Sequence, residues 1–400
     1  MAAKNLSDFR HLLQKYYHLM FFLGSLLVVF SLWFYYQGLT NNLQSNLAKV
    51  KAEKSILGKN LQITQNELNS LKNQDQYKIN KTLRVEIDSI QKTYTKAVDS
   101  YEKLLDLKAI SKPPAEFDNL LTKSLVFLSQ KNYASASASL LMLDESIQKE
   151  RDKLAASFVI PTNLPTDNQP PNSGFKQQQV SVDGQNFLVD IIAADLNSTK
   201  VIVDTASDSD CKDNCPVLSL ADYVSRSGAY AGVNGSYFCP ATYPTCADKK
   251  NSFDTLLMNK NKKYFNSDNN VYSVIPAIII SGTNIRYVNK SLEWGRDTGV
   301  DAVIANYPLL SSDGQVVFGG SSGPKINNKS SRSFVGSTGS TIYIGVVFNA
   351  STAETANVLK TLGLRFALNL DDGGSTALWF SGYKAGPGRN IPNAILFLKK

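Results

Sequence analysis

The pattern of apolar and polar positions divides the chain into segments that differ in apolar content and in periodicity. Residues 16–37 are apolar and aromatic, and residues 38–157 carry apolar side chains at helical spacing. Residues 175–400 consist mostly of short alternating runs, which predict strands. Residues 158–174 are rich in Pro, Asn and Thr and have no period, so we expect a linker there. Residues 1–15 form a short tail before the first apolar run.

The first apolar run predicts a transmembrane helix. Leu19 to Tyr36 contains no charged side chain, and about twenty helical residues span the ~30 Å hydrocarbon core of a bilayer. Lys4, Arg10 and Lys15 precede the run, and the next basic residue is Lys49, so the positive-inside rule places the N-terminus in the cytoplasm. A cleaved signal peptide is the alternative, which the bulky residues after the run disfavour. We expect an uncleaved anchor in the cell membrane and an extracytoplasmic remainder.

Residues 38–75 carry a heptad pattern in which the spacing alternates between four and three residues. The seam comprises Leu43, Leu47, Val50, Leu57, Leu61, Leu68 and Leu71, with Lys54 and Thr64 as polar interruptions. This is the period of a coiled coil, and it predicts a parallel homo-oligomer just outside the membrane. The alternative is a long amphipathic helix that packs on the helices after it. Residues 76–157 continue the helical period as a stalk or small bundle, with breaks at Pro113-Pro114 and near Lys131-Asn132.

The sequence predicts an α+β domain over residues 175–400. Helices are expected at 218–226 and 352–362, and Asp183-Gly184 is typical of a hairpin turn. The pattern favours one large sheet, mixed or mostly antiparallel. Its expected strands cover 178–182, 187–193, 200–204, 229–234, 274–280, 284–288, 300–304, 315–318, 333–336, 341–348 and 395–398.

Composition narrows the chemistry of this domain. The net charge is +8, but the basic residues are scattered, so an anionic polymer is expected as partner and nucleic acid is not. Both histidines, His11 and His18, lie in the first twenty residues. The domain therefore has no Ser-His-Asp triad, no Cys-His pair and no histidine ligand for a metal.

All four cysteines lie in the last domain. Cys211, Cys215, Cys239 and Cys246 predict two disulfides in an oxidising compartment, and we favour the local pairs over the two other pairings. A zinc site is the alternative, although the spacings differ from the usual knuckles. The sequence indicates no required cofactor. An acidic cluster is interpreted as a solvated loop, with a calcium site as the alternative; the cluster comprises Asp204, Asp208, Asp210 and Asp213.

An apolar run from Phe366 ends in two carboxylates and a two-glycine turn, Asp371-Asp372-Gly373-Gly374. The run predicts a buried strand, and the glycines allow a tight turn and close approach of a ligand to backbone N–H groups. A surface hairpin turn is the alternative, because Asp-Gly is common in such turns.

Four segments in order resemble the phosphodiester glycosidase family, which includes N-acetylglucosamine-1-phosphodiester α-N-acetylglucosaminidases. They are Gly232–Phe238, Ser331–Gly336, Glu354–Ser375 and Arg389–Ala394. The resemblance covers roughly Ser225 to Lys400 and leaves the anchor and the helical segment outside. Asp372 stands where the family usually has a third glycine.

The resemblance implies cleavage of a sugar-1-phosphodiester. Breaking the C1–O bond develops positive charge on the sugar and negative charge on the phosphate, so a carboxylate is needed near C1 and donors near the phosphate. Because the domain has only Glu293 and Glu354, we expect aspartate to act, with Asp371 as first choice for nucleophile or base and Asp372 second.

The remaining candidates bind the substrate. Arg332 and Arg389 are expected to pair with phosphate oxygens, and Arg332 is also a candidate catalytic residue. Asn234 is expected to bind a sugar hydroxyl or N-acetyl group, although Asn-Gly is often only a turn. Ser375 resembles a nucleophile but lacks a histidine base. The other substrate-binding candidates are Gly235, Gly373, Gly374, Ser375, Thr376 and Asn393, with backbone N–H groups at 373–375 as an anion pocket.

We therefore expect a membrane-anchored, extracytoplasmic phosphodiester glycosidase that acts on envelope polymers or exopolysaccharide. The alternative is a non-catalytic protein that binds glycopolymer, or assembles the envelope, through the same pocket.

Overall fold

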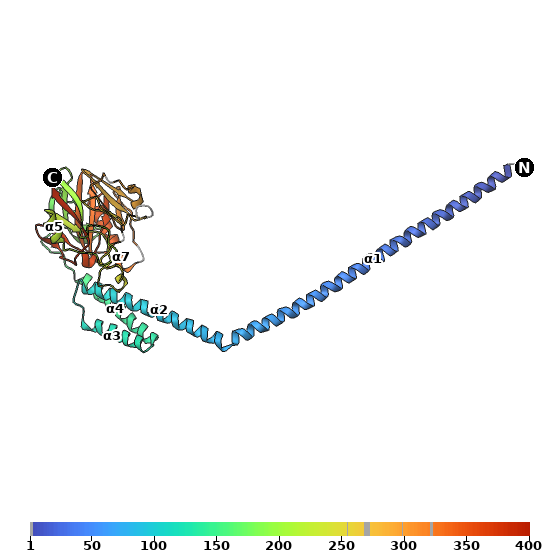
Figure 1. Ribbon diagram of the computed structural model, residues 1–400. Coiled ribbons are helices and arrows are strands. Elements are labelled where there is room, and N and C mark those ends of the chain that lie inside the picture. Colours follow the sequence, from blue (N-terminus) through green and yellow to red (C-terminus); the bar gives the residue numbers. More distant parts are fainter. Residues whose placement is uncertain (1–2, 254, 268–272, 298, 321–322) are drawn as a thin grey trace. The chain divides into compact units, whose positions relative to one another are not determined.

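The computed structural model describes residues 3–253, 255–267, 273–297, 299–320 and 323–400. They form two compact units, Met1–Asp88 and Ser89–Lys400. The first unit holds α1 (Ala3–Asn73) and the start of α2 (Asp75–Lys108), which is separated from α1 only at Gln74 (Figure 1). Within α1, the helical stretch Tyr16–Asn73 contains an 18-residue window with a mean hydropathy of 1.9, which is long and apolar enough to cross a membrane, and this window is not buried. Self-association through the heptad seam stays a prediction.

The second unit begins with a bundle of three helices, residues 89–157, called the helical bundle below. The C-terminal part of α2 packs with α3 (Ala115–Ser129) and α4 (Tyr133–Ser157), as Figure 1 shows. The predicted breaks are present, since Pro114 is the N-cap of α3 and the Asn132 side chain caps α4 by accepting from the Ser135 N–H. The apolar side chains at helical spacing form the bundle's own core, which includes Leu104, Leu107, Phe117, Leu128, Leu140, Leu143 and Ile147.

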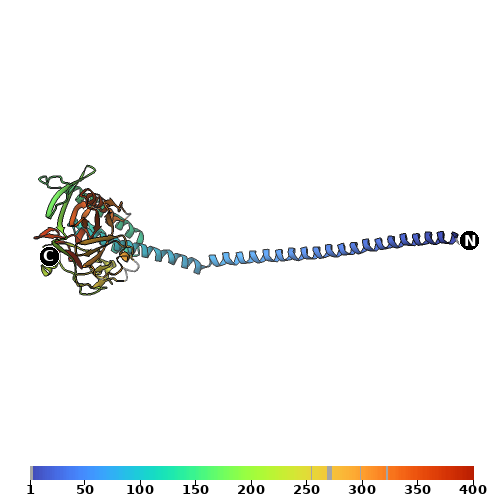
Figure 2. The same cartoon turned by 90° about the horizontal axis from the view of Figure 1, so that it is seen from above.

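The remainder of the second unit is an α+β domain (Figure 2), in which the strands of the described residues form three antiparallel sheets. The first sheet has the order β1-β2-β13-β12-β14-β10-β11. Its strands are β1 (Gly174–Val182), β2 (Gln185–Asp195), β10 (Leu309–Ser312), β11 (Gln315–Val316), β12 (Ser330–Thr338), β13 (Thr341–Ala350) and β14 (Phe366–Asn369).

The second sheet has the order β16-β15-β4-β17-β3 and the third β6-β5-β9-β7-β8. The strands of the second are β3 (Thr199–Thr205), β4 (Ala231–Asn234), β15 (Leu378–Phe380), β16 (Tyr383–Ala385) and β17 (Asn393–Lys399). Those of the third are β5 (Leu257–Met258), β6 (Tyr264–Phe265), β7 (Ala277–Ser281), β8 (Asn284–Val288) and β9 (Ala302–Ala305).

The expected α+β class and largely antiparallel pairing are confirmed, but the single large sheet is wrong. One apolar core joins the three sheets, with Ile192 and Leu368 from the first, Val233 from the second and Ile278 from the third. Because each sheet presents a face to this common core, its strands alternate as those of one sheet would, and periodicity alone could not separate them.

Two helices cover outer faces of these sheets. The helix α8 (Thr352–Thr361) packs on the first sheet and α5 (Leu220–Ser227) on the second. Each begins with a capping box, Ser351 with Glu354 and Ser219 with Asp222. Shorter helical turns are η1 (Pro244–Cys246), η2 (Ser291–Trp294), α7 (Pro324–Asn327) and η3 (Gly373–Ser375).

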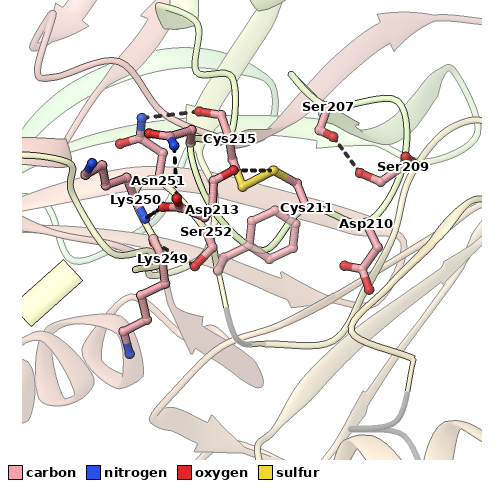
Figure 3. The surroundings of a disulfide bond; sticks show 12 residues. Ser207, Ser209, Asp210, Cys211, Asp213, Cys215, Lys249, Lys250, Asn251 and Ser252 are labelled. Carbon is pink, nitrogen blue, oxygen red and sulfur yellow. Dashed lines mark hydrogen bonds between the residues drawn. A yellow bond between two sulfur atoms is a disulfide. The ribbon is translucent and has the colours of Figure 1, made fainter. Parts of the chain in front are cut away.

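The cysteines form the two local disulfides, Cys211–Cys215 and Cys239–Cys246, as expected. Figure 3 shows the first, where the Asp213 carboxylate accepts from the backbone N–H of Lys250 at 2.7 Å. Asp204, expected in the same acidic cluster, is instead buried and paired with Arg226 and Lys260, both through Oδ2. The cluster is thus divided between a structural ion-pair network and the loop around this disulfide.

Candidate functional site

The two adjacent carboxylates lie where the chain passes from one sheet to another. Strand β14 in the first sheet ends at Asn369, and β15 in the second begins at Leu378. The connecting segment carries Asp371 and Asp372 and turns through η3, where Gly373 has a φ of 59°. The buried strand and glycine turn expected from the sequence are present, and they form a crossover between sheets in place of a surface hairpin.

Asn234, at the end of β4, holds this crossover from the side of the second sheet. Its Nδ2 donates to the carbonyl of Asp371 at 2.7 Å, and its Oδ1 accepts from the Ser333 hydroxyl at 2.7 Å and from the Ala377 N–H at 3.0 Å. The side chain is fully buried. Its polar atoms are engaged within the protein, so the structure favours a positioning role over the sugar contact expected from the sequence.

Gly235 and Asn393 pack against each other beside Asn234. A Cβ on Gly235 would lie 1.8 Å from Oδ1 of Asn393, so only glycine fits. Asn393 is buried and accepts from the backbone N–H of Ser236 at 2.9 Å, while Gly235 accepts from the N–H of Asp371 at 2.9 Å. These two predicted substrate contacts therefore support the backbone of the crossover.

Asp371 is a candidate whose acidity is strongly perturbed. Its side chain is 9 % exposed, it accepts from the Asp372 N–H at 2.9 Å and it is hydrogen-bonded to the Ser375 side chain. Burial, aided by the neighbouring Asp372, raises the pKa of Asp371 to about 7, although Ser375 and the charge of Arg389 act in the opposite direction. A carboxyl of this kind changes protonation near neutral pH, which suits acid–base work.

Asp372 is held by two side chains. Its Oδ2 forms an ion pair with Nη1 of Arg332 and accepts from the Tyr237 hydroxyl at 3.2 Å. Burial raises the pKa of Asp372, and Arg332 opposes this shift. Tyr237 in turn accepts from Nδ2 of Asn369 at 2.7 Å. The tyrosine, quoted from the sequence only as part of a motif, thus belongs to the site, and its position two residues after Gly235 was the available signal.

Arg332 is buried and directed inward. Its side chain is 1 % exposed, and besides Asp372 its guanidinium donates to four carbonyls: Ala350 (3.1 Å), Lys325 (2.8 Å), Ile326 (3.3 Å) and Asn328 (2.6 Å). A guanidinium with these partners is not placed to meet a substrate phosphate. The arrangement favours a role in fixing Asp372.

Arg389 is the better placed of the two predicted phosphate partners. It is half-buried, and its guanidinium makes no hydrogen bond to the residues that the structure describes. Its backbone N–H donates to the Gly374 carbonyl at 2.8 Å, and a Cβ on Gly374 would lie 2.4 Å from its Nη2. The glycine therefore leaves the space that the arginine side chain occupies, beside the turn of the crossover.

The predicted anion pocket of backbone N–H groups is only partly free. The Ser375 N–H donates to the Asp372 carbonyl at 3.2 Å, and the Thr376 N–H to the Gly373 carbonyl at 3.2 Å. The Thr376 hydroxyl donates to the Ser331 carbonyl. Within the described part of the chain, the N–H groups of Gly373 and Gly374 remain for a ligand.

The helical bundle contributes to the same region, which the sequence did not indicate. The Tyr243 hydroxyl donates to Asp106 of α2, and Glu102 one turn earlier accepts from the Thr245 N–H at 3.0 Å. Ala109 lies against Gly374, since a Cβ there would be 2.9 Å from that of Ala109. The end of α2 is therefore in contact with the turn that carries the candidate carboxylates.

Among the residues described, no group of three or more His, Cys, Asp or Glu side chains is arranged to hold a metal ion. What the geometry offers is a pair of adjacent carboxylates in a buried setting, a cation beside them and two backbone donors.

Comparison with known proteins identifies the domain. Residues 227–398 match the sequence model of the phosphodiester glycosidase family. No curated protein matches the chain. Solved structures that match include a hypothetical protein from Synechocystis, at 13 % identity over 56 % of this chain and 62 % of that one, with a TM-score of 0.41. This chain thus spans under two thirds of the Synechocystis protein.

Two further solved structures match. One is the zebrafish N-acetylglucosamine-1-phosphodiester α-N-acetylglucosaminidase catalytic domain auto-inhibited by its pro-peptide, at 13 % identity over 59 % of this chain and 87 % of that one, with a TM-score of 0.44. The other is a putative exported protein from Burkholderia pseudomallei, at 13 % identity over 53 % and 74 %, with a TM-score of 0.35. On the match of the family model, residues 227–398 of this chain form a phosphodiester glycosidase family domain.

Proposed function

We propose that this domain hydrolyses sugar-1-phosphodiester linkages of the N-acetylglucosamine-1-phosphate type. The observation that carries the proposal is the pair of a buried Asp371 and a half-buried Asp372 at a crossover between sheets, next to Arg389 and inside the segment that matches the family. A glycosidic centre needs a carboxylate beside C1 and a cation beside the leaving phosphate, and this pair and arginine supply both kinds of group.

In the proposed reaction, the bond from C1 to the phosphate oxygen breaks, and C1 bonds either directly to water or first to the carboxylate of Asp371, which water then replaces. The electron pair of that bond leaves with the phosphate, which Arg389 and the N–H groups of Gly373 and Gly374 stabilise. Asp371 acts as the base that takes the proton of the water, or as the nucleophile that the water later displaces. Either role requires its ionised form. Asp372 stabilises the positive charge on the sugar, and Arg332 and Tyr237 fix its position.

We further propose that the helix in α1 anchors the chain in the cell membrane with the N-terminus in the cytoplasm, so that the domain faces envelope polymers or exopolysaccharide. The apolar window of α1 and the two disulfides support this placement. A seam of exposed leucines, among them Leu57 and Leu61, supports self-association of α1.

The test uses the full chain in detergent micelles, oxidised, with UDP-N-acetylglucosamine and with an envelope-polymer extract as substrates. We expect release of free sugar by the wild type and none by Asp371→Asn. Asp183→Asn is the matched control, because Asp183 is exposed in the β1–β2 turn and should leave release unchanged. Polymer binding without release by the wild type would contradict hydrolysis and favour the glycopolymer-binding alternative.

A further inference from the structure

The helical bundle and the glycosidase domain share a cluster of opposite charges next to Asp372. Its acidic centre is Asp106 on α2, whose Oδ1 accepts from Tyr243. Two cations of the glycosidase domain lie against the ring of that tyrosine: Nζ of Lys325 is 5.3 Å from the centroid, and Cζ of Arg389 is 5.7 Å away. The tyrosine thus places both cations and Asp106 around a single ring.

A third cation comes from α4 of the bundle. Arg151 precedes Ala155 by one helical turn, and the Ala155 carbonyl accepts from Nδ2 of Asn349 at 2.9 Å. The next residue after Asn349 is Ala350, whose carbonyl accepts from Nε of Arg332. This places one face of α4 beside Arg332. Arg151 interacts electrostatically with both Asp106 and Arg332.

The charges of the cluster are mutually dependent. Burial raises the pKa of Asp106, whereas Lys325, Arg151 and Arg389 act to lower it and Asp372 adds to the rise. Burial lowers the pKa of Arg151, and Asp106 opposes that effect. Asp106 is therefore the counter-ion of three cations, of which Arg151 and Arg389 are half-buried and Lys325 is exposed.

We propose that Lys325, Arg389 and Arg151 together form the phosphate-binding part of the site, with Asp106 as their internal counter-ion. The inference rests on the proposed function, because it assigns the phosphate of a sugar phosphodiester to this cluster. Arg151 and Asp106 lie outside the segment that matches the family, so the helical bundle becomes a wall of the site and not only a spacer. An anionic phosphodiester is the chemistry that three such donors recognise.

Removal of a cation and removal of the counter-ion should have opposite effects on phosphate binding. Removal of a cation deprives the phosphate of a charge-assisted hydrogen bond, so Arg151→Gln and Lys325→Gln should each weaken phosphate binding by about tenfold. Removal of the counter-ion leaves the cations unopposed, so Asp106→Asn should tighten binding by roughly three- to tenfold. All of these effects should shrink at high salt.

The experiment is calorimetric titration of inorganic phosphate into the full chain in detergent micelles at low ionic strength. Lys149→Gln is the control, since Lys149 is an exposed cation on the same helix as Arg151 and should leave the Kd unchanged. Circular dichroism confirms that each variant is folded. Lys325→Gln keeps the test decisive if Asp106→Asn does not fold, because Lys325 is exposed and only its backbone carbonyl contacts Arg332.

A Kd for Arg151→Gln equal to that of Lys149→Gln would overturn the contribution of the bundle. Weaker binding by a folded Asp106→Asn would overturn its role as counter-ion. The failure of the proposed function would be visible separately, as wild-type protein that binds phosphate with the predicted pattern and yet releases no sugar.

Discussion

The side chain of Asn234 donates from Nδ2 to the carbonyl oxygen of Asp371 at 2.7 Å and so joins the second sheet to the crossover from the first. The same side chain accepts from Ser333 of the first sheet and from Ala377 at the far end of the crossover. Three elements distant in sequence are thereby fixed by one buried amide, which sets where the Asp371 carboxyl lies.

Replacement of this amide should affect both stability and activity. Asn234→Ala leaves the Asp371 carbonyl, the Ser333 hydroxyl and the Ala377 N–H without their partner in a buried place, so we expect a loss of roughly 2–4 kcal/mol in the free energy of unfolding. Urea denaturation measures it. Asn186→Ala, at an exposed position of β2, should change little. A stability within about 0.5 kcal/mol of wild type for Asn234→Ala would refute the bridging role.

The ion pair between Arg332 and Asp372 should behave as a coupled unit. Arg332→Gln leaves the half-buried carboxylate of Asp372 with no guanidinium, which should cost up to about 3–5 kcal/mol, the loss for a fully buried pair. The double variant Arg332→Gln/Asp372→Asn should recover part of that loss, because no unpaired charge remains. A double-mutant cycle in urea measures the coupling. Additive losses would show that Arg332 does not act through Asp372.

The raised pKa of Asp371 predicts a pH-dependent stability. In the unfolded chain this carboxyl ionises near pH 4, whereas in the folded protein it ionises at about 7. The folded state therefore binds the extra proton in this window, and its stability falls as the pH rises from about 4 to 7. Asp371→Asn removes this effect.

We expect thermal unfolding of Asp371→Asn and wild type to coincide near pH 4 and to separate as the pH rises. The variant should be more stable by roughly 1–3 kcal/mol at pH 8. The wild-type rate of sugar release should increase through pH 7 as the base ionises. A constant difference in stability from pH 4 to 8 would show that the pKa of Asp371 is not raised.

The disulfide Cys239–Cys246 should matter more for the site than Cys211–Cys215. It encloses Tyr243 and Thr245, which contact Asp106 and Glu102 of the bundle. We expect the double serine variant of Cys239 and Cys246 to weaken phosphate binding, because the loop that carries Tyr243 loses its constraint. The corresponding variant of Cys211 and Cys215 is the control, and equal effects of the two would contradict this difference.

Several features of the fold could be predicted from local sequence patterns. The breaks at Pro113-Pro114 and near Lys131-Asn132 and the turn at Asp183-Gly184 depend on short-range chemistry, and the structure has each of them. The division into three sheets was not accessible, because the alternation in strands such as β4 and β14 states only that one face is buried. Alternation does not identify the neighbouring strand to which a given strand is hydrogen-bonded.

The two carboxylates and Arg389 could be predicted from the sequence, whereas the burial of Arg332 and the charges of the helical bundle could not. Asp371 and Asp372 stand out because two acids end an apolar strand before two glycines. Arg332 gave no sign that its guanidinium is enclosed by carbonyls, since burial of a long polar side chain is decided by tertiary contacts. Asp106 and Arg151 belong to amphipathic helices, on which charged residues are expected to face solvent. Only the packing of the bundle brings them to the site.

The position of the bond that breaks distinguishes a glycosidase from an enzyme that attacks phosphorus. The full chain in detergent micelles would be incubated with UDP-N-acetylglucosamine in water enriched in oxygen-18, and the released UDP analysed by mass spectrometry. Cleavage between C1 and oxygen puts the water oxygen on the sugar, so we predict unlabelled UDP. UDP that carries the heavy oxygen, or UMP with sugar phosphate, would mean attack at phosphorus and would contradict the glycosidase.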